Sequence, residues 1–454
     1  MKRKLLTLIL WSVFLPVFAQ NPLSGYITAG LKDNRVLREK NISLEQSLLA
    51  LKNAKSYFLP EVSFKTDYLT AQGGRQITFP AGDLLNGVYS TLNQITSSSR
   101  FPAVRNADEQ LLPNNFYDAR VHVTYALLNT DRDFNKRISK QQVVLQEYEV
   151  ETYTQELVRE IKQAYYNYCA SLDAIGIYRD AYVLVTQNLR VNQSLLKNGK
   201  GLPANVLRAE SEREAVSAKI IDAENVRLNA RNYLNFLINR PLTDSVVSEK
   251  QDLPDSLLRT ITGKPETGQR SELKRADAAL ALSGLTVQKN RNFAIPKVNS
   301  FFDAGSQASD FKYNSKSRYY FLGVSLDVPI FSGGRNRNNI KQAELEHSSL
   351  ELQKDQLAVN LQLMAENALN NVRSSLAAVQ VSEKQQTAAK AYFRLIEKGY
   401  NEGTNSLIEY LDARDQLTFS SLKLNISQYN LLSQLADYER QTAVSNLKKS
   451  NQKQ

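Results

Sequence analysis

The stretch from Lys398 to Arg414, KGYNEGTNSLIEYLDAR, interrupts a chain that otherwise has the pattern of long helices. Before it, residues 335 to 398 keep apolar side chains at three- and four-residue steps without a glycine or proline. The same spacing resumes from about 404 to 445. Glycine accepts the backbone conformations that a tight reversal needs. The stretch therefore predicts the tip of a hairpin between two helices.

A similar arrangement occurs earlier in the chain. A helical pattern runs from 132 to 197, the turn NGKG follows, and a return helix is expected from about 204 to 240. At about 1.5 Å per residue, each long helix would measure roughly 95 to 100 Å. Helices of this length exceed a globular domain, so we expect them to lie along one another as coiled coils.

The repeat extends beyond the turns. The piece KSYFLPEVSFKTDY (55 to 68) resembles RNFAIPKVNSFFDA (291 to 304), and VHVTYALLNTDRDFNK (121 to 136) parallels VSLDVPIFSGGRNRNN (324 to 339). In each half, a short helix precedes a strand, a loop, a second strand, a long helix, a glycine turn and a return helix. A period near 200 residues is too long for a solenoid and indicates a duplicated half-molecule.

This repeat divides the chain into domains. We expect a first repeat over 20–240 and a second over 272–445, with short helices at 31–57 and 272–292. The segment 241–271 contains three prolines and is predicted to be a linker.

Two terminal segments stand outside the repeats. Residues 1–19 combine three basic residues, an apolar run and a small-residue cleavage site, which predicts a secretory signal. The polar tail 446–454 is predicted to be disordered.

Four segments alternate apolar and polar residues with period two, as half-buried strands do. They have the length that a tilted strand needs to cross a bilayer, although a sheet in a soluble protein gives the same pattern. One side of these strands is apolar, and the other carries polar residues such as Lys65, Arg120, His122 and Asp327. The strands are expected at about 61–70, 118–128, 297–306 and 318–331.

A sheet that faces lipid must close on itself, because open edges leave backbone groups unpaired in hydrocarbon. Four strands are too few to close a barrel, for which about eight is the minimum. The chain must therefore assemble with copies of itself. Two copies would supply eight strands and three would supply twelve, and the periodicity leaves both open.

Composition argues against several other functions. The formal charge of +11 is spread along the chain without the basic and aromatic clusters of a nucleic-acid interface. The single cysteine, Cys169, and the two histidines form no metal-ligand spacing. We expect no catalytic site, no cofactor and no nucleic-acid partner.

From residue 20 to 445, the chain resembles the TolC family of outer-membrane efflux proteins. The resemblance rests on the duplicated halves, on VPIFSGGR (328–335) and above all on GTNSLIEYLDAR (403–414). It implies a mixed α and β membrane protein: a homotrimer whose twelve-stranded outer-membrane β-barrel continues into a periplasmic α-helical coiled-coil barrel.

The same resemblance implies an exit duct for a tripartite efflux pump or a type I secretion system. Its partners would be a periplasmic adaptor, or membrane fusion protein, and an inner-membrane pump, besides outer-membrane lipid. The alternative is a periplasmic coiled-coil scaffold or adaptor with a small soluble sheet.

The resemblance also implies roles for individual residues. The adaptor would dock at the hairpin tips, which correspond to Gly199, Gly201, Gly399 and Gly403. A periplasmic gate would comprise five residues: Tyr400, Asn205, Asn405, Glu409 and Asp412. The two asparagines stand where the family has a base and an acid, so amide hydrogen bonds would make a weaker latch than a salt bridge.

Glu409 and Asp412 are one helical turn apart, which by itself is typical of a solvated helix face. In a trimer each would become a ring of three carboxylates, and such rings favour cations and attract divalent ions. We therefore hypothesise cation preference and a divalent plug at these two positions.

The loop from 71 to 117 is far longer than its counterpart near 306–317. Long loops of outer-membrane barrels face the exterior. The sequence leaves open whether this loop caps the pore, binds an external molecule or is flexible filler.

Overall fold

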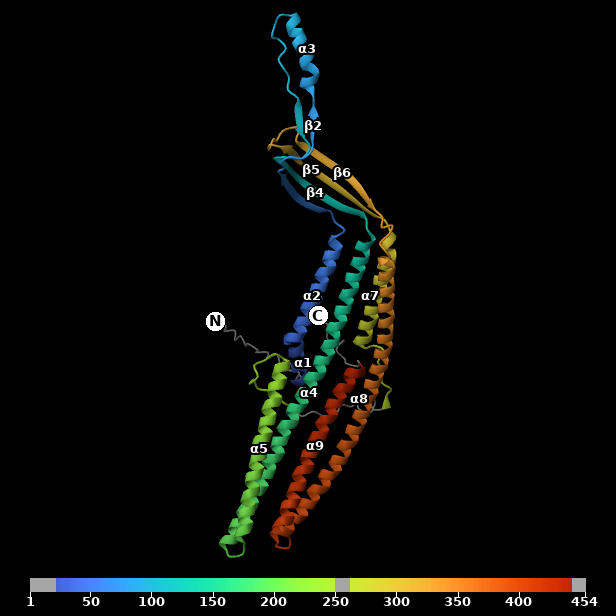
Figure 1. The fold of residues 1–454 in the computed structure, drawn as a ribbon. Helices are drawn as coiled ribbons and strands as arrows, with labels where there is room; N and C mark the ends of the chain where they lie inside the picture. Colours follow the sequence, from blue (N-terminus) through green and yellow to red (C-terminus); the bar gives the residue numbers. More distant parts are fainter. Residues whose placement is uncertain (1–21, 250–261, 443–454) are drawn as a thin grey trace, which may run out of the picture. The chain divides into compact units, whose positions relative to one another are not determined.

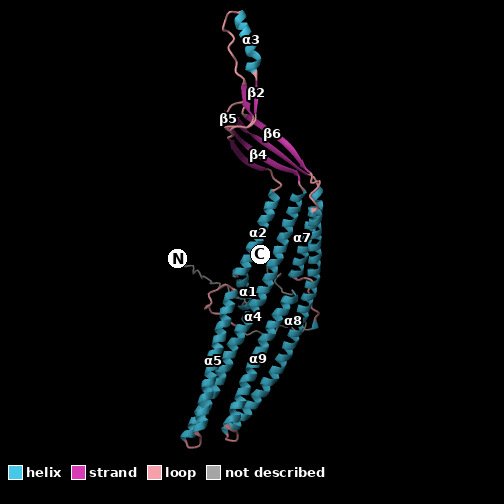
Figure 2. Cartoon of the chain, in the orientation of Figure 1, coloured by secondary structure: helices cyan, strands magenta, loops and turns pink. Residues whose placement is uncertain are grey.

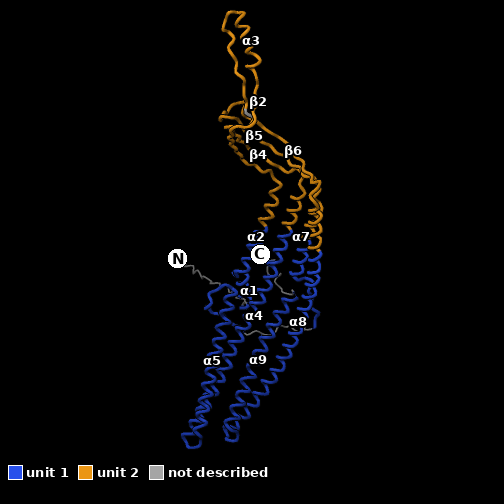
Figure 3. The backbone as a smooth tube through the Cα atoms, in the orientation of Figure 1, with its two compact units in different colours: residues 1–47, 141–281, 348–454 blue, residues 48–140, 282–347 orange. Residues whose placement is uncertain are grey.

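The computed structural model describes residues 22–249 and 262–442 of the 454-residue chain. The expected signal (1–19), the expected tail (446–454) and the middle of the predicted linker lie outside the described residues. The chain divides into two compact units, coloured separately in Figure 3. We call them the sheet unit (48–140 and 282–347) and the helix unit (1–47, 141–281 and 348–454).

Helices make up most of the described chain (Figures 1 and 2). Helix α4 has 68 residues and α8 has 67, as their unbroken apolar spacing predicts. Each is slightly longer than expected, because α4 begins at Thr130 and α8 ends at Asn401. The helices are α1 (Pro22–Asp33), α2 (Arg35–Ser56), α3 (Ala81–Ile95), α4 (Thr130–Lys197), α5 (Pro203–Leu237), α7 (Ser271–Arg291), α8 (Arg335–Asn401) and α9 (Leu407–Thr442). None of the helices in the described part of the chain has an apolar stretch that could span a membrane.

The first short helix differs from its prediction, 31–57, because helical structure begins at Pro22 and is divided at Asn34. The Asn34 side chain accepts a hydrogen bond from the Leu37 amide at 2.9 Å and so caps α2. Its amide nitrogen donates to the Leu237 carbonyl at 2.8 Å. Asn34 is buried, and it fixes the break between α1 and α2 by bonding to α5 as well.

The sheet unit contains a four-stranded antiparallel sheet in the order β1-β4-β5-β6. The two halves of the repeat meet where β4 pairs with β5, and β1 and β6 form the two edges. Strand β6 ends at Asp327, earlier than the predicted 331, because Pro329 lacks the N–H that would continue the ladder. The strands are β1 (Glu61–Leu69), β4 (Phe116–Leu128), β5 (Lys297–Ser309) and β6 (Arg318–Asp327).

The two faces of this sheet differ in chemistry. Residues opposite one another in paired strands lie on the same face, so Ser63, His122 and Asp303 share one face. Apolar side chains occupy the other face and are widely exposed in the protomer: Val62 (66%), Phe64 (70%), Tyr320 (77%), Leu322 (71%), Val324 (65%) and Leu326 (66%). Such an apolar surface indicates contact with lipid or with another molecule.

Ionic contacts organise the polar face. His122 Nδ1 lies 2.5 Å from Asp303 Oδ1, which links β4 to β5. Arg120 pairs with Asp118 and with Asp67, the latter at 3.4 Å. Residues 118, 120 and 122 are consecutive positions on one face of β4, so the predicted alternation holds for this strand.

Two glycines in the sheet are required by close approach. A Cβ at Gly305 would lie 2.2 Å from the Ala119 carbonyl oxygen and 2.7 Å from the Arg120 Cβ. A Cβ at Gly323 would lie 2.3 Å from Cζ of Phe301. These glycines leave room for the Arg120 backbone and side chain and for the Phe301 ring on the same face.

The long segment between β1 and β4 is folded, which corrects the expectation of a loop over 71–117. It contains the two-stranded ribbon β2 (Gln76–Phe79) and β3 (Ala107–Gln110), with helix α3 between them. Apolar residues at helical spacing in AGDLLNGVYSTLNQI (81–95) account for α3. We call residues 71–114 the insertion; α3 and the ribbon are labelled in Figure 1.

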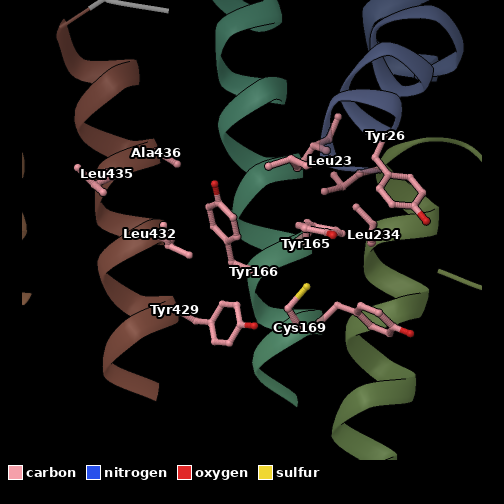
Figure 4. Close-up of a cluster of buried hydrophobic side chains, with 14 of the residues drawn as sticks. Leu23, Tyr26, Tyr165, Tyr166, Cys169, Leu234, Tyr429, Leu432, Leu435 and Ala436 are labelled. Atoms are coloured by element: carbon pink, nitrogen blue, oxygen red, sulfur yellow. The ribbon is translucent and has the colours of Figure 1, made fainter. Parts of the chain in front are cut away.

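The core of the helix unit lies where α1, α4, α5, α8 and α9 pack together, and Figure 4 shows part of it. Tyr165, Tyr166 and Cys169 of α4 occupy its middle and are buried. Burial raises the pKa of the Cys169 thiol to about 12, so this thiol is an apolar packing element. The other labelled residues are Leu23, Tyr26, Leu234, Tyr429, Leu432, Leu435 and Ala436.

A buried ionic network joins α4, α7 and α9 in the helix unit. The Glu272 carboxylate accepts hydrogen bonds from Arg270 at 2.7 Å and from Arg440 at 2.6 Å. Arg440 also bonds to Glu156 of α4 at 3.2 Å. Burial alone would raise the pKa of Glu272, but the two guanidinium groups outweigh it and lower that pKa to about 2.

Candidate functional site

Both hairpin tips of the helix unit end their long helix in the same way. After α4, the Gly199 amide donates to Leu196 O and the Lys200 amide to Leu195 O. After α8, the Gly403 amide donates to Tyr400 O and the Thr404 amide to Gly399 O. Each pair of bonds is a Schellman motif, whose C′ residue adopts the left-handed conformation. Gly199 has φ +68° and Gly403 has φ +80°, as this motif requires.

The other two predicted tip glycines have a different role. Helix α8 continues through Gly399 to Asn401, so the expected break at Gly399 is wrong. A Cβ at Gly399 would lie 1.9 Å from the Asn405 side-chain oxygen, and one at Gly201 would lie 2.7 Å from the Leu196 amide nitrogen. These two glycines allow the turns to fold closely against the helix ends.

Ser406 and Glu409 together cap the N-terminus of α9. Its Oε2 accepts hydrogen bonds from the Ser406 amide at 2.7 Å and the Ser406 hydroxyl at 3.0 Å. The Ser406 hydroxyl in turn accepts from the Glu409 amide at 3.3 Å. This is a capping box, and Ser-Leu-Ile-Glu is its sequence signature. Hydrogen bonds from the Ser406 amide and hydroxyl and from Asn405 lower the pKa of Glu409.

An open groove of about 1320 Å³ lies between the two tips. It brings together four of the five predicted gate residues, Asn205, Tyr400, Asn405 and Asp412, and its lining also includes Gly201 and Gly403. Glu409 lies outside this lining. The charged residues of the groove are Lys200, Arg208, Glu402, Asp412 and Asp415.

Tyr400 connects the second hairpin to the first. Its hydroxyl accepts a hydrogen bond from Asn192 Nδ2 of α4 at 2.9 Å. Asn192 is buried and also donates to Asn188 Oδ1 at 3.1 Å. The Tyr400 ring packs against Tyr410, with ring centroids 4.9 Å apart. Asn192 lies within the apolar pattern of α4, so its position along the chain carries no signal of this contact.

Arg414 makes a second connection between the hairpins. Its Nη2 donates to Glu212 Oε2 of α5 at 2.9 Å, and the Arg414 side chain is 1% exposed. Asp415 lies 3.0 Å from the same nitrogen, and Arg208 pairs with Glu212 at 2.7 Å. Among the described residues, Nε and Nη1 of Arg414 have no hydrogen-bond partner. The spacing of Leu407, Leu411 and Arg414 places this arginine on the buried side of α9, and this signal is readable in the sequence.

The residues at the tips pack against one another, cap the helix ends and form ion pairs. Within the described residues, no group of three or more His, Cys, Asp or Glu side chains could hold a metal ion in a single chain. A plug at Glu409 and Asp412 would therefore require carboxylates from several copies, and it stays a hypothesis.

Residues 267–448 match the sequence model of a family described as outer membrane efflux protein. The outer membrane protein TolC of Escherichia coli is 20% identical over 437 residues, covering 91% of this chain and 80% of the relative. The outer membrane protein TolC of Vibrio cholerae is 22% identical over 288 residues, and that match covers 61% of this chain and 65% of the relative.

The solved structure of the CmeC outer membrane channel of Campylobacter jejuni has the same fold. The TM-score is 0.72 at 16% sequence identity, with 93% of this chain and 85% of the other covered.

Proposed function

Because the chain belongs to the outer membrane efflux protein family, we propose that it is an outer-membrane exit channel that passes substrates to the exterior for an efflux or type I secretion system. The observation that carries this proposal is the two-faced sheet. All four strands expose apolar side chains on one face, and the other face carries their charged and polar residues together with the stacked rings of Phe301 and Phe321. A membrane-spanning strand needs lipid on one side and water on the other.

The proposed assembly is a homotrimer. Edge strand β1 of one copy would pair with edge strand β6 of the next, and three copies would close a barrel of twelve strands in the outer membrane. Closure by pairing satisfies the backbone groups that an edge leaves exposed. Three pairs of hairpins would continue the duct as a coiled-coil barrel in the periplasm.

The proposed partners are a periplasmic adaptor and an inner-membrane pump. The adaptor's docking surface would be the tips, where Lys200 and Glu402 are exposed beside the Schellman glycines. Cysteine substitution at Glu402 would place a thiol where a cross-linker can reach a docked hairpin. A cross-linked product with the adaptor is expected in whole cells.

A fractionation experiment tests the assembly. We expect the full chain in the outer-membrane fraction as an oligomer that resists SDS until it is heated, with three times the mass of the heated chain. The alternative, a periplasmic scaffold with a small sheet, requires a chain that leaves the cell with the soluble periplasmic fraction. Recovery there, without a heat-sensitive oligomer, would overturn the proposal.

A further inference from the structure

The insertion has almost no core of its own in the protomer. Between residues 71 and 109, all with described burial, Gly82 is the single buried residue. A two-stranded ribbon is marginally stable in water unless a helix or further strands cover it. The insertion nevertheless holds a helix with apolar side chains, and a second molecule that covers them would stabilise it.

One side of α3 is occupied by its own chain. Asn86 exchanges two hydrogen bonds with the backbone of Val104, at 2.8 and 2.9 Å. Asn93 does the same with the backbone of Phe101, at 2.8 and 3.1 Å. Asn106 caps the helix by accepting from the Gly82 and Asp83 amides. These side chains attach the segment 101–106 along one face of the helix.

The opposite side of α3 is apolar and uncovered in the protomer. At 3.6 residues per turn, Leu84 and Val88 project about half a turn away from Asn86. Leu84 is 64% exposed, Val88 55% and Ile95 76%. Together with Ala81 and Thr91, these residues repeat at steps of 3, 4, 3 and 4, which is the heptad pattern of a coiled-coil seam. We call Ala81, Leu84, Val88, Thr91 and Ile95 the α3 seam.

The charge of α3 argues against a lipid surface as the occupant. Helices that lie in a membrane interface carry lysine and arginine on their polar face. The fifteen residues of α3 contain no basic side chain, and Asp83 is their one charged residue. The polar flank is formed by Asp83, Ser90 and Gln94.

The position of the insertion in the sheet unit indicates a second copy as the occupant. The insertion follows β1, the edge strand that would pair with β6 of the next copy. It leaves the sheet at the same end as the β5–β6 turn, because β1 and β4 are antiparallel and the helices join the other end. In the proposed trimer, three identical seams would therefore rise from one rim.

We propose that the α3 seams of three copies pack against one another as a short three-helix coiled coil that caps the outer mouth of the channel. The inference rests on the proposed trimer, and the heptad spacing supplies the additional argument that the partner is another such helix. Contact between the seams removes from water the apolar side chains that the protomer leaves exposed.

Disulfide trapping in isolated outer membranes tests this cap on the full chain. Val88→Cys and Thr91→Cys place thiols in the seam, and Ser90→Cys is the matched control on the polar flank. The natural Cys169 is buried, so the unsubstituted chain gives the background. An added mild oxidant accepts the two electrons that the paired thiols release, and the disulfide can form where the two Cα atoms lie about 4.4–6.8 Å apart.

We expect a product of twice the chain mass from Val88→Cys and Thr91→Cys, and none above background from Ser90→Cys. One bond joins two of three thiols, so at most about two in three chains should be cross-linked. A heat-sensitive trimer band without any Val88 or Thr91 product would overturn the cap and leave the proposed function intact. Equal products at all three positions, or a product with another protein, would also overturn it.

If the unheated sample shows no trimer, the proposed assembly fails. Disulfide-linked dimers of Val88→Cys and Thr91→Cys would then still support pairing of α3 between copies. If these dimers were also absent, the proposed cap would be refuted as well.

Discussion

The buried guanidinium of Arg414 on α9 donates from Nη2 to Oε2 of Glu212 on α5 at 2.9 Å, and this pair joins the two hairpins of the helix unit. Removing one partner of a buried pair typically costs about 3 kcal/mol or more when no other counter-ion remains. Here the Asp415 carboxylate lies 3.0 Å from the same Arg414 nitrogen and would remain. We therefore expect Glu212→Ala to lower the apparent free energy of unfolding by less, about 2 kcal/mol, measured from the helical circular dichroism signal in a urea titration.

Arg208→Ala is the control for this variant. Arg208 also pairs with Glu212, but its side chain is 63% exposed, so the loss should stay within about 1 kcal/mol. Equal effects of the two substitutions would contradict a special role for the buried pair.

The ionic network around Glu272 predicts a stability loss in acid. The pKa of Glu272 is about 2 in the folded chain, against an ordinary value of 4.5. A lowered folded pKa stabilises the fold above the unfolded pKa, and this contribution disappears as the pH falls from about 4.5 toward 2. Its full size is about 3 kcal/mol.

The measurement compares urea midpoints of the wild type and Glu272→Gln across this pH range. The difference between the two proteins should shrink as the pH falls, because both then lack the carboxylate charge. A difference that stays constant down to pH 2 would show that Glu272 is not ionised in the network.

The positive φ of the tip glycine Gly403 predicts that a side chain at this position lowers the stability of the protein. At φ +80°, an alanine would adopt the left-handed conformation, which costs about 1–2 kcal/mol. Gly403→Ala should therefore lower the thermal midpoint, and Gly403→Asn should do so less, since asparagine tolerates this conformation.

Gly176 offers a matched control within α4. Nothing lies within 4 Å of a Cβ placed there, and its φ is not positive. Gly176→Ala should raise stability by about 0.5–1 kcal/mol, because glycine is a poor helix former. A loss at Gly176 as large as the loss at Gly403 would remove the conformational explanation.

The groove between the tips predicts unequal roles for the two acids of the proposed gate. Asp412 lines the groove, whereas the Glu409 carboxylate is engaged by Ser406. We expect Asp412→Asn to reduce cation selectivity and divalent block in planar bilayers more than Glu409→Gln does. A wild-type channel that is anion-selective and insensitive to divalent cations would refute the carboxylate-ring hypothesis.

Periodicity predicted the elements whose pattern is long. The spacing of α4 and α8 continues over more than sixty residues, and the structure follows it to within three residues at each end. The alternation in β1 and β4 likewise assigned the correct faces. Shorter signals set the boundaries that the patterns missed, such as Pro329 beyond β6 and Asn34 between α1 and α2.

Helix α3 was missed because its composition resembles a loop. Gly82, Gly87, Asn86 and Asn93 are poor helix formers, but both asparagines bond to the backbone of a neighbouring segment. Such partners cannot be read from local propensity. The apolar spacing of Leu84, Val88 and Ile95 was the available signal.

At the tips, the sequence predicted four residues that line the groove, but it did not predict the contacts between the two hairpins. Tyr400, Asn205, Asn405 and Asp412 were predicted together and line one groove. The hydrogen bond from Asn192 to Tyr400 depends on how α8 is aligned with α4, and the Arg414–Glu212 pair depends on how α9 is aligned with α5. The hydrophobic pattern alone does not fix either alignment. The capping role of Glu409 could be predicted from the sequence, because Ser406 and Glu409 have the spacing of a capping box.

The sheet of this protein has two edges, β1 and β6, and the proposed ring needs both edges of every copy. A subunit damaged at one edge could still join its neighbours through the other and would leave the ring open. In a cell that makes intact and damaged subunits in equal amounts, only about one trimer in eight would be free of damage if they mix at random. A lesion in an edge strand should therefore be dominant over a normal gene copy, whereas a lesion that prevents the whole chain from folding should be recessive.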